Sequence, residues 1–325
     1  MEQDKISIVI PVYKTEAYME QCLSSVQRQT YENLEVLMID DGSPDGAAKI
    51  CQSYVDGDSR FHLIRQENQG LGMAKNTGVS HATGKYVCFV DSDDWIHEDY
   101  IRILYKNLIQ YKADLSMCGY VKFADGTEPK GKNTGEVCLL EKQKMLADLS
   151  TAGAGSKGEP VVVSWNKMIA TKLMKEIQFP AYLHEDEFVI GDYLLKTSRI
   201  VYTDAQLYYY RQRTGSIMRQ KADWRHCQVI YAIGRRLEQF KDPAYEALWP
   251  QMLEAYFENA ILWQYILDTK ETREKSKKII LPHARMMWRN YHKLLPVRQQ
   301  LRYLFFLCSQ KGYKKKYYET MENGN

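Results

Sequence analysis

The sequence has no regular cysteine pattern. Its seven cysteines are an odd number, and no two of them form a C-x-x-C pair. Because several lie within apolar runs, we expect reduced, buried thiols, and the spacing excludes a disulfide framework or a zinc site. The sequence also has no apolar run long enough to span a bilayer and no leader-like segment before its first strand-like run. These absences predict a cytoplasmic protein.

A dinucleotide-binding fingerprint is missing as well. Residues 68–72 read Asn-Gln-Gly-Leu-Gly, but the complete fingerprint should follow the first strand of the chain. That strand is instead followed by Pro11-Val12-Tyr13-Lys14, and Lys75 stands where the last glycine belongs. The sequence therefore excludes this class of dinucleotide-binding protein.

Charge is distributed unevenly along the chain. The net charge is only +3, yet residues 270–316 contain nine Lys and five Arg against two Glu. The remainder is therefore acidic, which argues against a nucleic-acid partner. The basic C-terminal stretch also contains Trp, Phe, Leu and Tyr, a mixture that suits an interfacial helix on anionic lipid. A basic helix that packs on the rest of the protein is an equally good interpretation.

Strands and helices alternate in the first third of the chain. This order predicts an α/β fold with a mostly parallel sheet and helices on its faces. Ligands of such sheets bind beyond the carboxyl ends of the strands. Further strands are expected at 161–165, 199–203 and 206–211, and helices follow from residue 221 onward. Strand-like runs lie at 6–12, 35–39, 61–65 and 85–90, with helical patterns between them at 46–54 and 70–81.

An acidic cluster, Asp91-Ser92-Asp93-Asp94, directly follows the fourth strand-like run. Clustered carboxylates repel one another unless a cation compensates them. Hard divalent ions take oxygen ligands and bridge carboxylates to substrate phosphates, so a D-x-D motif at a strand end suits a metal–diphosphate site. The alternative is that Asp93 or Asp94 caps a helix expected near residues 96–111.

Three other polar motifs have both a functional and a structural interpretation. Asp40-Asp41 ends a strand and can accept hydrogen bonds from a base or ribose, or simply shape the following turn. Glu185-Asp186 begins a predicted helix, where the acids either favour the helix dipole or include a general base. Arg211 and Arg213 flank a turn and could clamp phosphate, or belong to a solvated basic loop.

Taken together, seven segments in order resemble the family-2 inverting glycosyltransferases with a GT-A fold. The resemblance covers roughly residues 5–216 and is far more specific than any one motif. It implies a Rossmann-like, mostly parallel sheet flanked by helices, with a C-terminal helical extension. The matching segments are SIVIPVYK (7–14), SSVQRQTYENLEVLMIDDGSPDG (24–46), ENQGLGMAKNTG (67–78), GKYVCFVDSDDW (84–95), NK (166–167), HEDE (184–187) and YYYRQRTGSIM (208–218).

The resemblance implies a role for each matching residue. Asp93 would hold Mn²⁺ or Mg²⁺, with Asp91 beside ribose or the metal-bound oxygens. Asp186 would be the catalytic base, with Glu185 as its neighbour. The substrate-binding residues implied are Pro11, Tyr13, Asp40 and Asp41 for the nucleoside, Asn68 and Lys75 near the base and phosphates, Asn166, and Arg211, Arg213 and Ser216 at the leaving diphosphate.

Two departures from the family pattern bear on the expected phosphate contact of Lys75 and on how many sugars are added. Lys75 stands where the family commonly has Arg, and lysine lacks the bidentate fork. The Q-x-x-R-W signature of processive synthases is absent, together with their membrane helices. We therefore expect one or a few sugars to be added per acceptor.

The implied reaction is a single inverting displacement. A sugar would pass from a nucleotide diphosphate-sugar, with a UDP-sugar favoured, to a hydroxyl of a glycan or lipid-linked glycan in bacterial polysaccharide biosynthesis. The expected domains are a catalytic domain at 1–219, with a nucleotide-sugar half at about 1–95 and an acceptor half at 96–219, and a basic helical region at 220–325. That region could place the protein peripherally on the inner face of the membrane. A nucleotidyltransferase and a non-catalytic nucleotide-sugar-binding protein remain alternatives.

Overall fold

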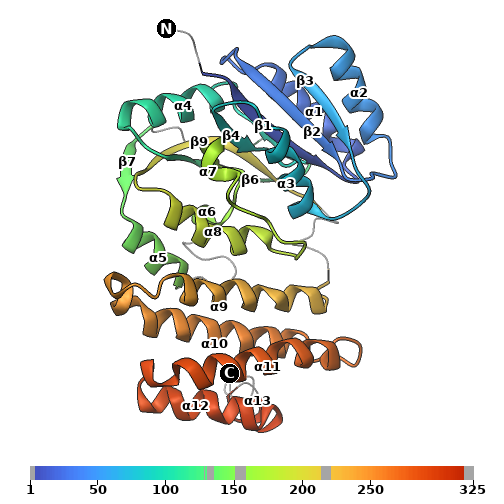
Figure 1. Ribbon diagram of the computed structural model, residues 1–325. Coiled ribbons are helices and arrows are strands. Elements are labelled where there is room, and N and C mark those ends of the chain that lie inside the picture. Colours follow the sequence, from blue (N-terminus) through green and yellow to red (C-terminus); the bar gives the residue numbers. More distant parts are fainter. Residues whose placement is uncertain (1–3, 128, 130–134, 151–158, 214–220, 318–325) are drawn as a thin grey trace. The chain divides into compact units, whose positions relative to one another are not determined.

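The structure is a computed structural model that describes residues 4–127, 129, 135–150, 159–213 and 221–317 (Figure 1). The chain forms two compact units, and each combines segments that are distant in sequence. Unit 1 comprises Met1–Lys142, Val162–Ala181 and Asp192–Gln220, and unit 2 comprises Gln143–Val161, Tyr182–Gly191 and Lys221–Asn325.

Unit 1 is built on a nine-stranded sheet with the order β3-β2-β1-β4-β8-β6-β9-β5, and β7 also pairs with β9. Strands β1 to β4 run parallel to one another, and β6 runs parallel to β9. Strand β8 is antiparallel to both β4 and β6. The strands are β1 (Ile6–Val12), β2 (Leu34–Asp40), β3 (Phe61–Arg65), β4 (Tyr86–Phe89), β5 (Trp95–Ile96), β6 (Leu115–Ala124), β7 (Val137–Leu140), β8 (Lys167–Ala170) and β9 (Ile200–Gln212).

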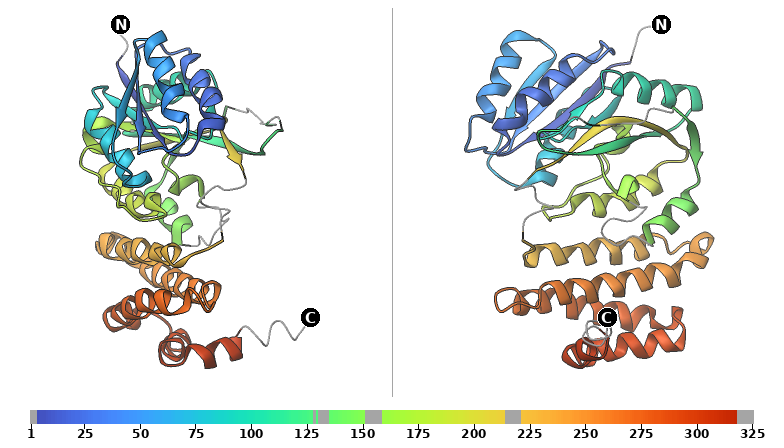
Figure 2. Two further views of the ribbon diagram at one scale, coloured as in Figure 1. Left: turned by 90° about the vertical axis from the view of Figure 1, so that its right-hand side faces the viewer. Right: turned by 180° about the vertical axis from the view of Figure 1, so that it is seen from behind.

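Helices cover both faces of this sheet (Figure 2). Strands β1 and β2 are mostly apolar and buried along their whole length, as expected for strands between two helical layers. On one face, alternate β1 residues pack with helices α1 (Glu16–Gln27), α2 (Ala47–Gly57) and α4 (Tyr100–Tyr111). On the other, α3 (Leu71–His81) lies so close to β1 that a Cβ on Gly78 would clash with Val9. The expected α/β class with a mostly parallel sheet is confirmed.

Two local expectations are wrong. Residues 161–165, expected as a strand, instead follow or end the short helix α6 (Glu159–Val162), and the strand β8 begins only at Lys167. The two strands expected at 199–203 and 206–211 are one continuous strand, β9. The register of its pairing with β6 shifts on either side of Gly119. This local irregularity lets β9 continue through residues 204 and 205, between the two runs expected as separate strands.

Unit 2 is helical. Its main helices are α9 (Val229–Gln239), α10 (Trp249–Ile266), α11 (Arg273–Tyr291), α12 (Val297–Cys308) and α13 (Gln310–Tyr317). Helix α5 (Lys142–Ser150) belongs mostly to this unit, and α8 (Glu185–Lys196) begins in unit 2 and ends in unit 1. Aromatic contacts hold the helices together: Phe257 on α10 stacks on Tyr303 of α12, with ring centroids 4.6 Å apart. The expected C-terminal helical extension is confirmed.

The cysteines and the helix lengths bear on two further expectations. All seven thiols are free, and five are buried as expected, but Cys138 and Cys308 are exposed. The expectation of buried thiols is therefore wrong for these two, which lie on β7 and at the end of α12. Among the helices that the structure describes, none is long and apolar enough to cross a membrane.

Candidate active site

The acidic cluster forms a tight turn immediately after β4. The backbone N–H of Asp94 donates to the carbonyl of Asp91 at 3.0 Å, which closes the turn. Asp91 and Asp93 are partly exposed, whereas Asp94 is only 1% exposed. Helix α4 begins at Tyr100, with Asp99 before it. The helix-cap interpretation of Asp93 and Asp94 is therefore wrong, since the helix begins well beyond them.

The buried side chains of Asp94 and Tyr208 hold this turn in place through hydrogen bonds. The Tyr208 hydroxyl donates to Asp94 Oδ2 at 2.9 Å and accepts from the Asp91 backbone N–H at 3.0 Å. Asp94 Oδ1 accepts the backbone N–H of Arg211 at 2.7 Å. Burial, followed by the charges of Asp93 and Asp91, raises the pKa of Asp94 well above its usual range. Neither Asp94 nor Tyr208 is among the site residues predicted from the sequence. Asp94 could have been included because it is the third carboxylate of the acidic cluster, whereas Tyr208 has no such local signal.

Arg211 lies inside unit 1, at 7% exposed, and its donors are engaged by protein groups. Its Nε donates to the carbonyl of Asp93 at 2.8 Å, and its two other nitrogens donate to Asp125 and Gln21. The guanidinium also lies about 5 Å from the rings of Tyr18, Trp95 and Phe123. In this structure Arg211 therefore anchors the acidic turn to β9, and its contact with a leaving diphosphate stays a prediction.

Arg213 lies closer to the functional atoms. Its Nε donates to Asp93 Oδ2 at 2.7 Å, and its guanidinium lies 5.1 Å from the centre of the Tyr18 ring. Positive charge thus stands directly beside the carboxylate expected to hold a metal ion. Ser216, the third residue expected at the diphosphate, lies outside the described residues.

Asp40 and Asp41 shape the loops beyond β2. Asp40 accepts the backbone N–H of Ser43 at 2.9 Å. Asp41 is buried, and its carboxylate accepts the backbone N–H groups of Gln69 and Gly70 at 2.9 and 2.8 Å. The same carboxylate accepts from the Gln66 side chain, and the Asn68 amide donates to the Asp41 carbonyl. Asp41 therefore fixes the loop before α3, and these bonds leave one lone pair on Oδ2 that could accept an N–H of a base.

The register of the sheet brings the ends of β1, β2 and β4 to one edge. Val12 pairs with Asp40, and Val9 pairs with Phe89. Pro11 and the exposed Tyr13, at the end of β1, therefore lie at the same edge as the Asp40-Asp41 loop and the acidic turn. This is the edge at which open parallel sheets bind nucleotides.

Lys75 and Asn166 lie in the interior of unit 1. The Lys75 ammonium donates to Ser164 Oγ at 2.9 Å and lies 5.2 Å from the centre of the Phe179 ring. The Asn166 amide donates to the Cys118 carbonyl at 3.1 Å and accepts from Lys167. Both side chains are almost fully buried, so their direct contact with substrate stays a prediction.

Glu185 and Asp186 occupy the first turn of α8, within unit 2. Glu185 is buried and Asp186 is partly buried. The preceding residue, His184, has a φ of 60°, which turns the chain sharply into the helix. Glu187 in the same turn forms an ion pair with Arg236 of α9, so this end of α8 is anchored within the helical unit. The catalytic role of Asp186 and the role of Glu185 stay predictions.

The acidic turn has the donor chemistry for Mn²⁺ or Mg²⁺. Among the described residues no group of three His, Cys, Asp or Glu side chains could hold a metal alone. Mg²⁺-type sites, however, commonly use one or two carboxylates and complete their coordination with substrate phosphates. Asp91 and Asp93 supply two such carboxylates, and Asp93 also forms an ion pair with the Arg213 guanidinium. The residues fit a metal that is bound together with a diphosphate.

Comparison with known proteins identifies the class. Residues 7–178 match the family described as Glycosyl transferase family 2, and the chain belongs to this family. It is similar to "Glycosyltransferase GlyA" of Streptococcus pneumoniae, with 32% identity over 79% of this chain and 38% of GlyA. It is also similar to "Glycosyltransferase GlyG" of that organism, with 33% identity over 67% of this chain and 74% of GlyG. The chain thus spans well under half the length of GlyA and about three quarters of GlyG.

Solved structures share the fold. Residues 1–349 of S. aureus TarS in complex with UDP-GlcNAc superpose with a TM-score of 0.75 at 18% identity, covering 99% of this chain and 92% of that one. The mannosyltransferase PcManGT from Pyrobaculum calidifontis, in complex with GDP-Man and Mn²⁺, superposes with a TM-score of 0.53 at 14% identity, covering 97% and 89%. At these identities the likeness concerns the GT-A fold alone.

Proposed function

We propose that the chain is a metal-dependent, inverting glycosyltransferase that moves a sugar from a nucleotide diphosphate-sugar to an acceptor hydroxyl of a bacterial glycan. The observation that carries this proposal is the Asp91–Asp93 turn at the carboxyl edge of the sheet, in a chain of Glycosyl transferase family 2. The UDP-GlcNAc bound by TarS favours a UDP-sugar as donor, and the Mn²⁺ bound by PcManGT favours a divalent metal.

The proposed roles in unit 1 are supported by the positions of its side chains, and the role of Asp186 by the family to which the chain belongs. Tyr13 and the Asp41 loop receive the nucleoside, and Asp91 and Asp93 hold the metal. A bound divalent cation supplies positive charge beside the departing diphosphate. Arg213 adds a guanidinium beside Asp93, which strengthens this electrostatic stabilisation. Asp186 removes the proton from the acceptor hydroxyl as that oxygen attacks the anomeric carbon.

The test is nucleoside diphosphate release from a panel of UDP-, GDP- and TDP-sugars, with Mn²⁺ or with EDTA, in the presence of glycan acceptors. Wild type should release one nucleoside diphosphate in a metal-dependent way, and Asp93→Ala should lose that activity. Asp186→Asn should keep donor binding in calorimetry but lose turnover by about 10²-fold or more. Asp56→Ala, which removes an exposed acid from α2, serves as the matched control.

Other outcomes of this assay identify the alternatives. Release of pyrophosphate would indicate a nucleotidyltransferase. Donor binding without turnover on every acceptor would indicate a binding protein. Wild-type turnover in Asp186→Asn would exclude Asp186 as the base.

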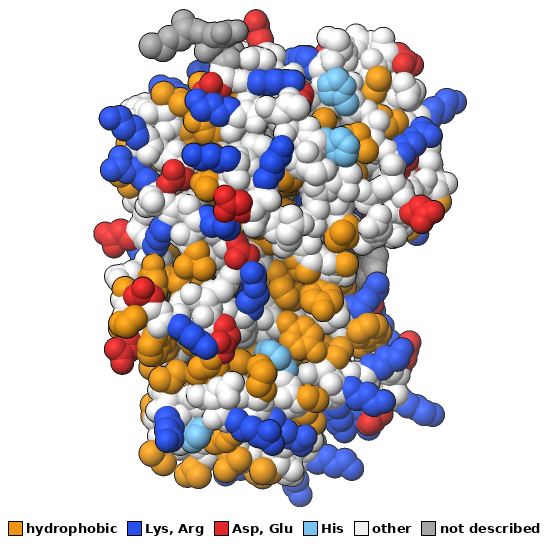
Figure 3. Space-filling model, viewed as in Figure 1, with side chains coloured by type: hydrophobic (Ala, Val, Ile, Leu, Met, Phe, Trp, Pro, Cys, Tyr) orange, Lys and Arg blue, Asp and Glu red, His pale blue; other side chains and the backbone are white. Residues whose placement is uncertain are grey.

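We also propose that the acceptor lies at a membrane surface, because unit 2 presents an amphipathic face. Helix α12 leaves Val297, Leu301 and Leu304 exposed at 69%, 63% and 41%. These positions recur at helical spacing on one side of the helix. The surrounding stretch 270–316 is strongly basic, and Figure 3 shows Lys and Arg side chains among hydrophobic ones over these helices. Such a surface suits anionic lipid, where a lipid-linked glycan would be presented.

A further inference from the structure

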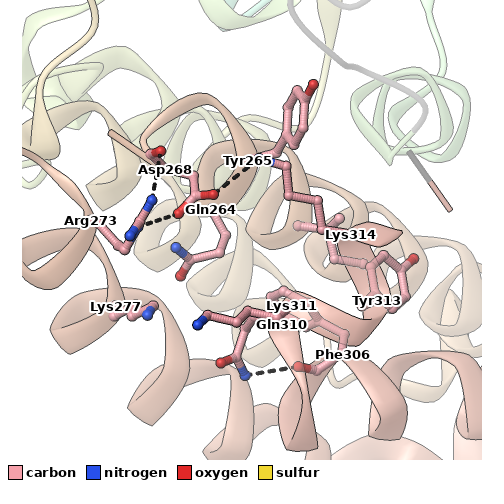
Figure 4. Close-up of a pocket in the computed structure, with 11 residues that line it drawn as sticks. Gln264, Tyr265, Asp268, Arg273, Lys277, Phe306, Gln310, Lys311, Tyr313 and Lys314 are labelled. Atoms are coloured by element: carbon pink, nitrogen blue, oxygen red, sulfur yellow. Dashed lines mark hydrogen bonds and ion pairs between the residues drawn. The ribbon is translucent and has the colours of Figure 1, made fainter. Parts of the chain in front are cut away.

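Unit 2 contains a pocket of about 120 Å³ among helices α10, α11, α12 and α13. Figure 4 shows the side chains that line it. None of them belongs to the residues assigned to the proposed reaction. The polar residues that matter for its chemistry are Gln264, Asp268, Arg273, Lys277, Lys311 and Lys314.

The pocket is strongly cationic. Four basic side chains and one carboxylate line it. The carboxylate, Asp268, pairs with two of the four, Arg273 and Lys314. Burial alone would raise the pKa of Asp268, but hydrogen bonds from Lys314 and Arg273 lower it, so this carboxylate is charged. Because Asp268 is shared between two cations, it cannot neutralise the others.

Lys277 and Lys311 carry the uncompensated charge. Lys277 pairs with Glu274 at 3.7 Å, but Glu274 is largely exposed, and such surface ion pairs are weak. Lys311 forms no ion pair with any residue that the structure describes. The two ammonium groups point toward one another across the pocket (Figure 4). Two converging like charges repel unless an anion lies between them.

Gln264 adds an unpaired acceptor to this cationic surface. Its side chain is 6% exposed, and its Oε1 has no hydrogen-bond partner within the described part of the chain. The amide points into the same space as the two lysines (Figure 4). A buried acceptor without a donor is costly, so this position favours a ligand that brings a hydroxyl.

We propose that this pocket binds a phosphate ester that carries hydroxyl groups, with Lys277 and Lys311 on the phosphate and Gln264 accepting from a hydroxyl. A soluble polyol phosphate and the glycerol-phosphate headgroup of a lipid share this chemistry. The pocket lies wholly in unit 2, and the proposal does not rest on the proposed reaction, because no lining residue has a role in it.

The test is calorimetric titration of the full chain with glycerol 1-phosphate. The double variant Lys277→Gln/Lys311→Gln should bind at least tenfold more weakly than wild type. Its matched control is Lys278→Gln/Lys315→Gln, which removes the same charge from the same two helices at exposed positions that do not line the pocket. The control should stay within twofold of wild type. Because the donor site is identical in both variants, binding there cannot produce the difference.

A second variant separates the hydroxyl from the phosphate. Gln264→Leu should fold normally, because it replaces an unpaired buried amide with a side chain of similar size. It should weaken binding of glycerol 1-phosphate several-fold and leave binding of inorganic phosphate unchanged. Equal loss for both probes would exclude the proposed role of Gln264.

Vesicle binding then distinguishes the source of the phosphate. Loss of binding to phosphatidylglycerol vesicles in Lys277→Gln/Lys311→Gln, but not in its control, indicates a lipid headgroup. Unchanged vesicle binding with lost glycerol 1-phosphate binding indicates a soluble ester. Equal weakening in both double variants, or no binding of glycerol 1-phosphate by wild type at millimolar concentration, overturns the proposal.

Discussion

At the scale of single residues, the acidic turn separates side chains that can meet a ligand from side chains that support it. Asp91 and Asp93 are partly exposed, whereas Asp94 and Tyr208 are buried and bond to the turn. Arg211 resembles a phosphate ligand in the sequence, but its guanidinium is bonded to protein groups on all three nitrogens. Arg213, whose guanidinium contacts Asp93 directly, is therefore the arginine that we propose beside the diphosphate.

A second buried carboxylate, Glu35, stabilises the opposite end of the parallel strands. Glu35 lies near the start of β2, and its oxygens accept from Ser7, from the Thr83 backbone and hydroxyl, and from the Gly84 backbone. Lys5 also pairs with it at 2.9 Å. Burial alone would raise the pKa of Glu35, but these hydrogen bonds lower it to about 2.

This carboxylate should make folding stability depend on acid. Since the folded pKa is about 2 and the ordinary value is 4.5, the contribution is complete above about pH 4.5 and is lost as the pH falls toward 2. Glu35→Gln should lower the free energy of unfolding at pH 7 by about 3 kcal/mol and narrow its difference from wild type in acid. Urea unfolding across this pH range measures both effects. The exposed Glu32→Gln should match wild type, and a pH-independent difference for Glu35→Gln would contradict the assignment.

The sequence predicts the exposed acids of the turn but not their supports. Asp91 and Asp93 follow a strongly apolar run, so local pattern alone places them at a strand end. Tyr208 reaches the turn only because β9 enters the same sheet far later in the chain. Such long-range pairing leaves no local signal, and a run of three tyrosines does not reveal which ring is buried.

At the scale of secondary structure elements, α12 is unusual because its apolar residues lie on two sides. Tyr303, Phe306 and Leu307 are buried within unit 2, while Val297 and Leu301 lie on the exposed side. A helix that only needed to pack would leave polar side chains on that outer face. The exposed stripe therefore supports the proposal of a lipid-facing surface.

Substitution of this stripe should weaken membrane binding without unfolding the protein. Leu301→Gln/Leu304→Gln should reduce partitioning onto phosphatidylglycerol vesicles roughly tenfold, because burial of each leucine in the interface is worth on the order of 1 kcal/mol. Vesicle co-sedimentation measures this change. The control Ile109→Gln/Leu195→Gln removes two exposed apolar side chains from α4 and α8. Equal pelleting of wild type and both variants would exclude a lipid-binding role for α12.

Element boundaries were predictable where the apolar pattern was regular. Strands β1 to β4 and helix α3 lie close to the expected ranges because each is a clear run bounded by turn residues. The apolar run at 161–165 predicts a strand because β-branched residues dominate it, and this prediction is wrong. Tertiary pairing of β8 with β4 and β6 instead places the strand a few residues later.

At the scale of the whole molecule, the chain does not divide at one point. The expected boundary between residues 219 and 220 separates most of the helices, but residues 143–161 and 182–191 also belong to unit 2. Within that unit, Arg235 donates to the carbonyl of Phe188, and Gln143 donates to the carbonyl of Ala244. Analysis of the sequence alone detects the change of composition near residue 220. It does not detect that two segments inside the first 219 residues pack with the helices that follow.

A fragment of residues 1–219 should therefore fold poorly. It would retain the start of α8 but lose α9, which provides Arg235 and Arg236 as partners for that segment. We expect aggregation or a broad, low-temperature transition in circular dichroism, whereas a fragment of residues 1–269 keeps α9 and α10 and should unfold more cooperatively. A fragment 1–219 with the melting temperature of the full chain would show that the segments 143–161 and 182–191 do not depend on the helices.

The two exposed thiols make the protein straightforward to label. Cys308 ends α12 on the same side as Val297, Leu301 and Leu304, and the other exposed cysteine, Cys138, lies on β7. Cys138→Ser would leave one reactive thiol at the margin of the apolar stripe. An environment-sensitive dye attached there would sit where lipid is expected, so its emission would follow docking in real time without any engineered attachment site.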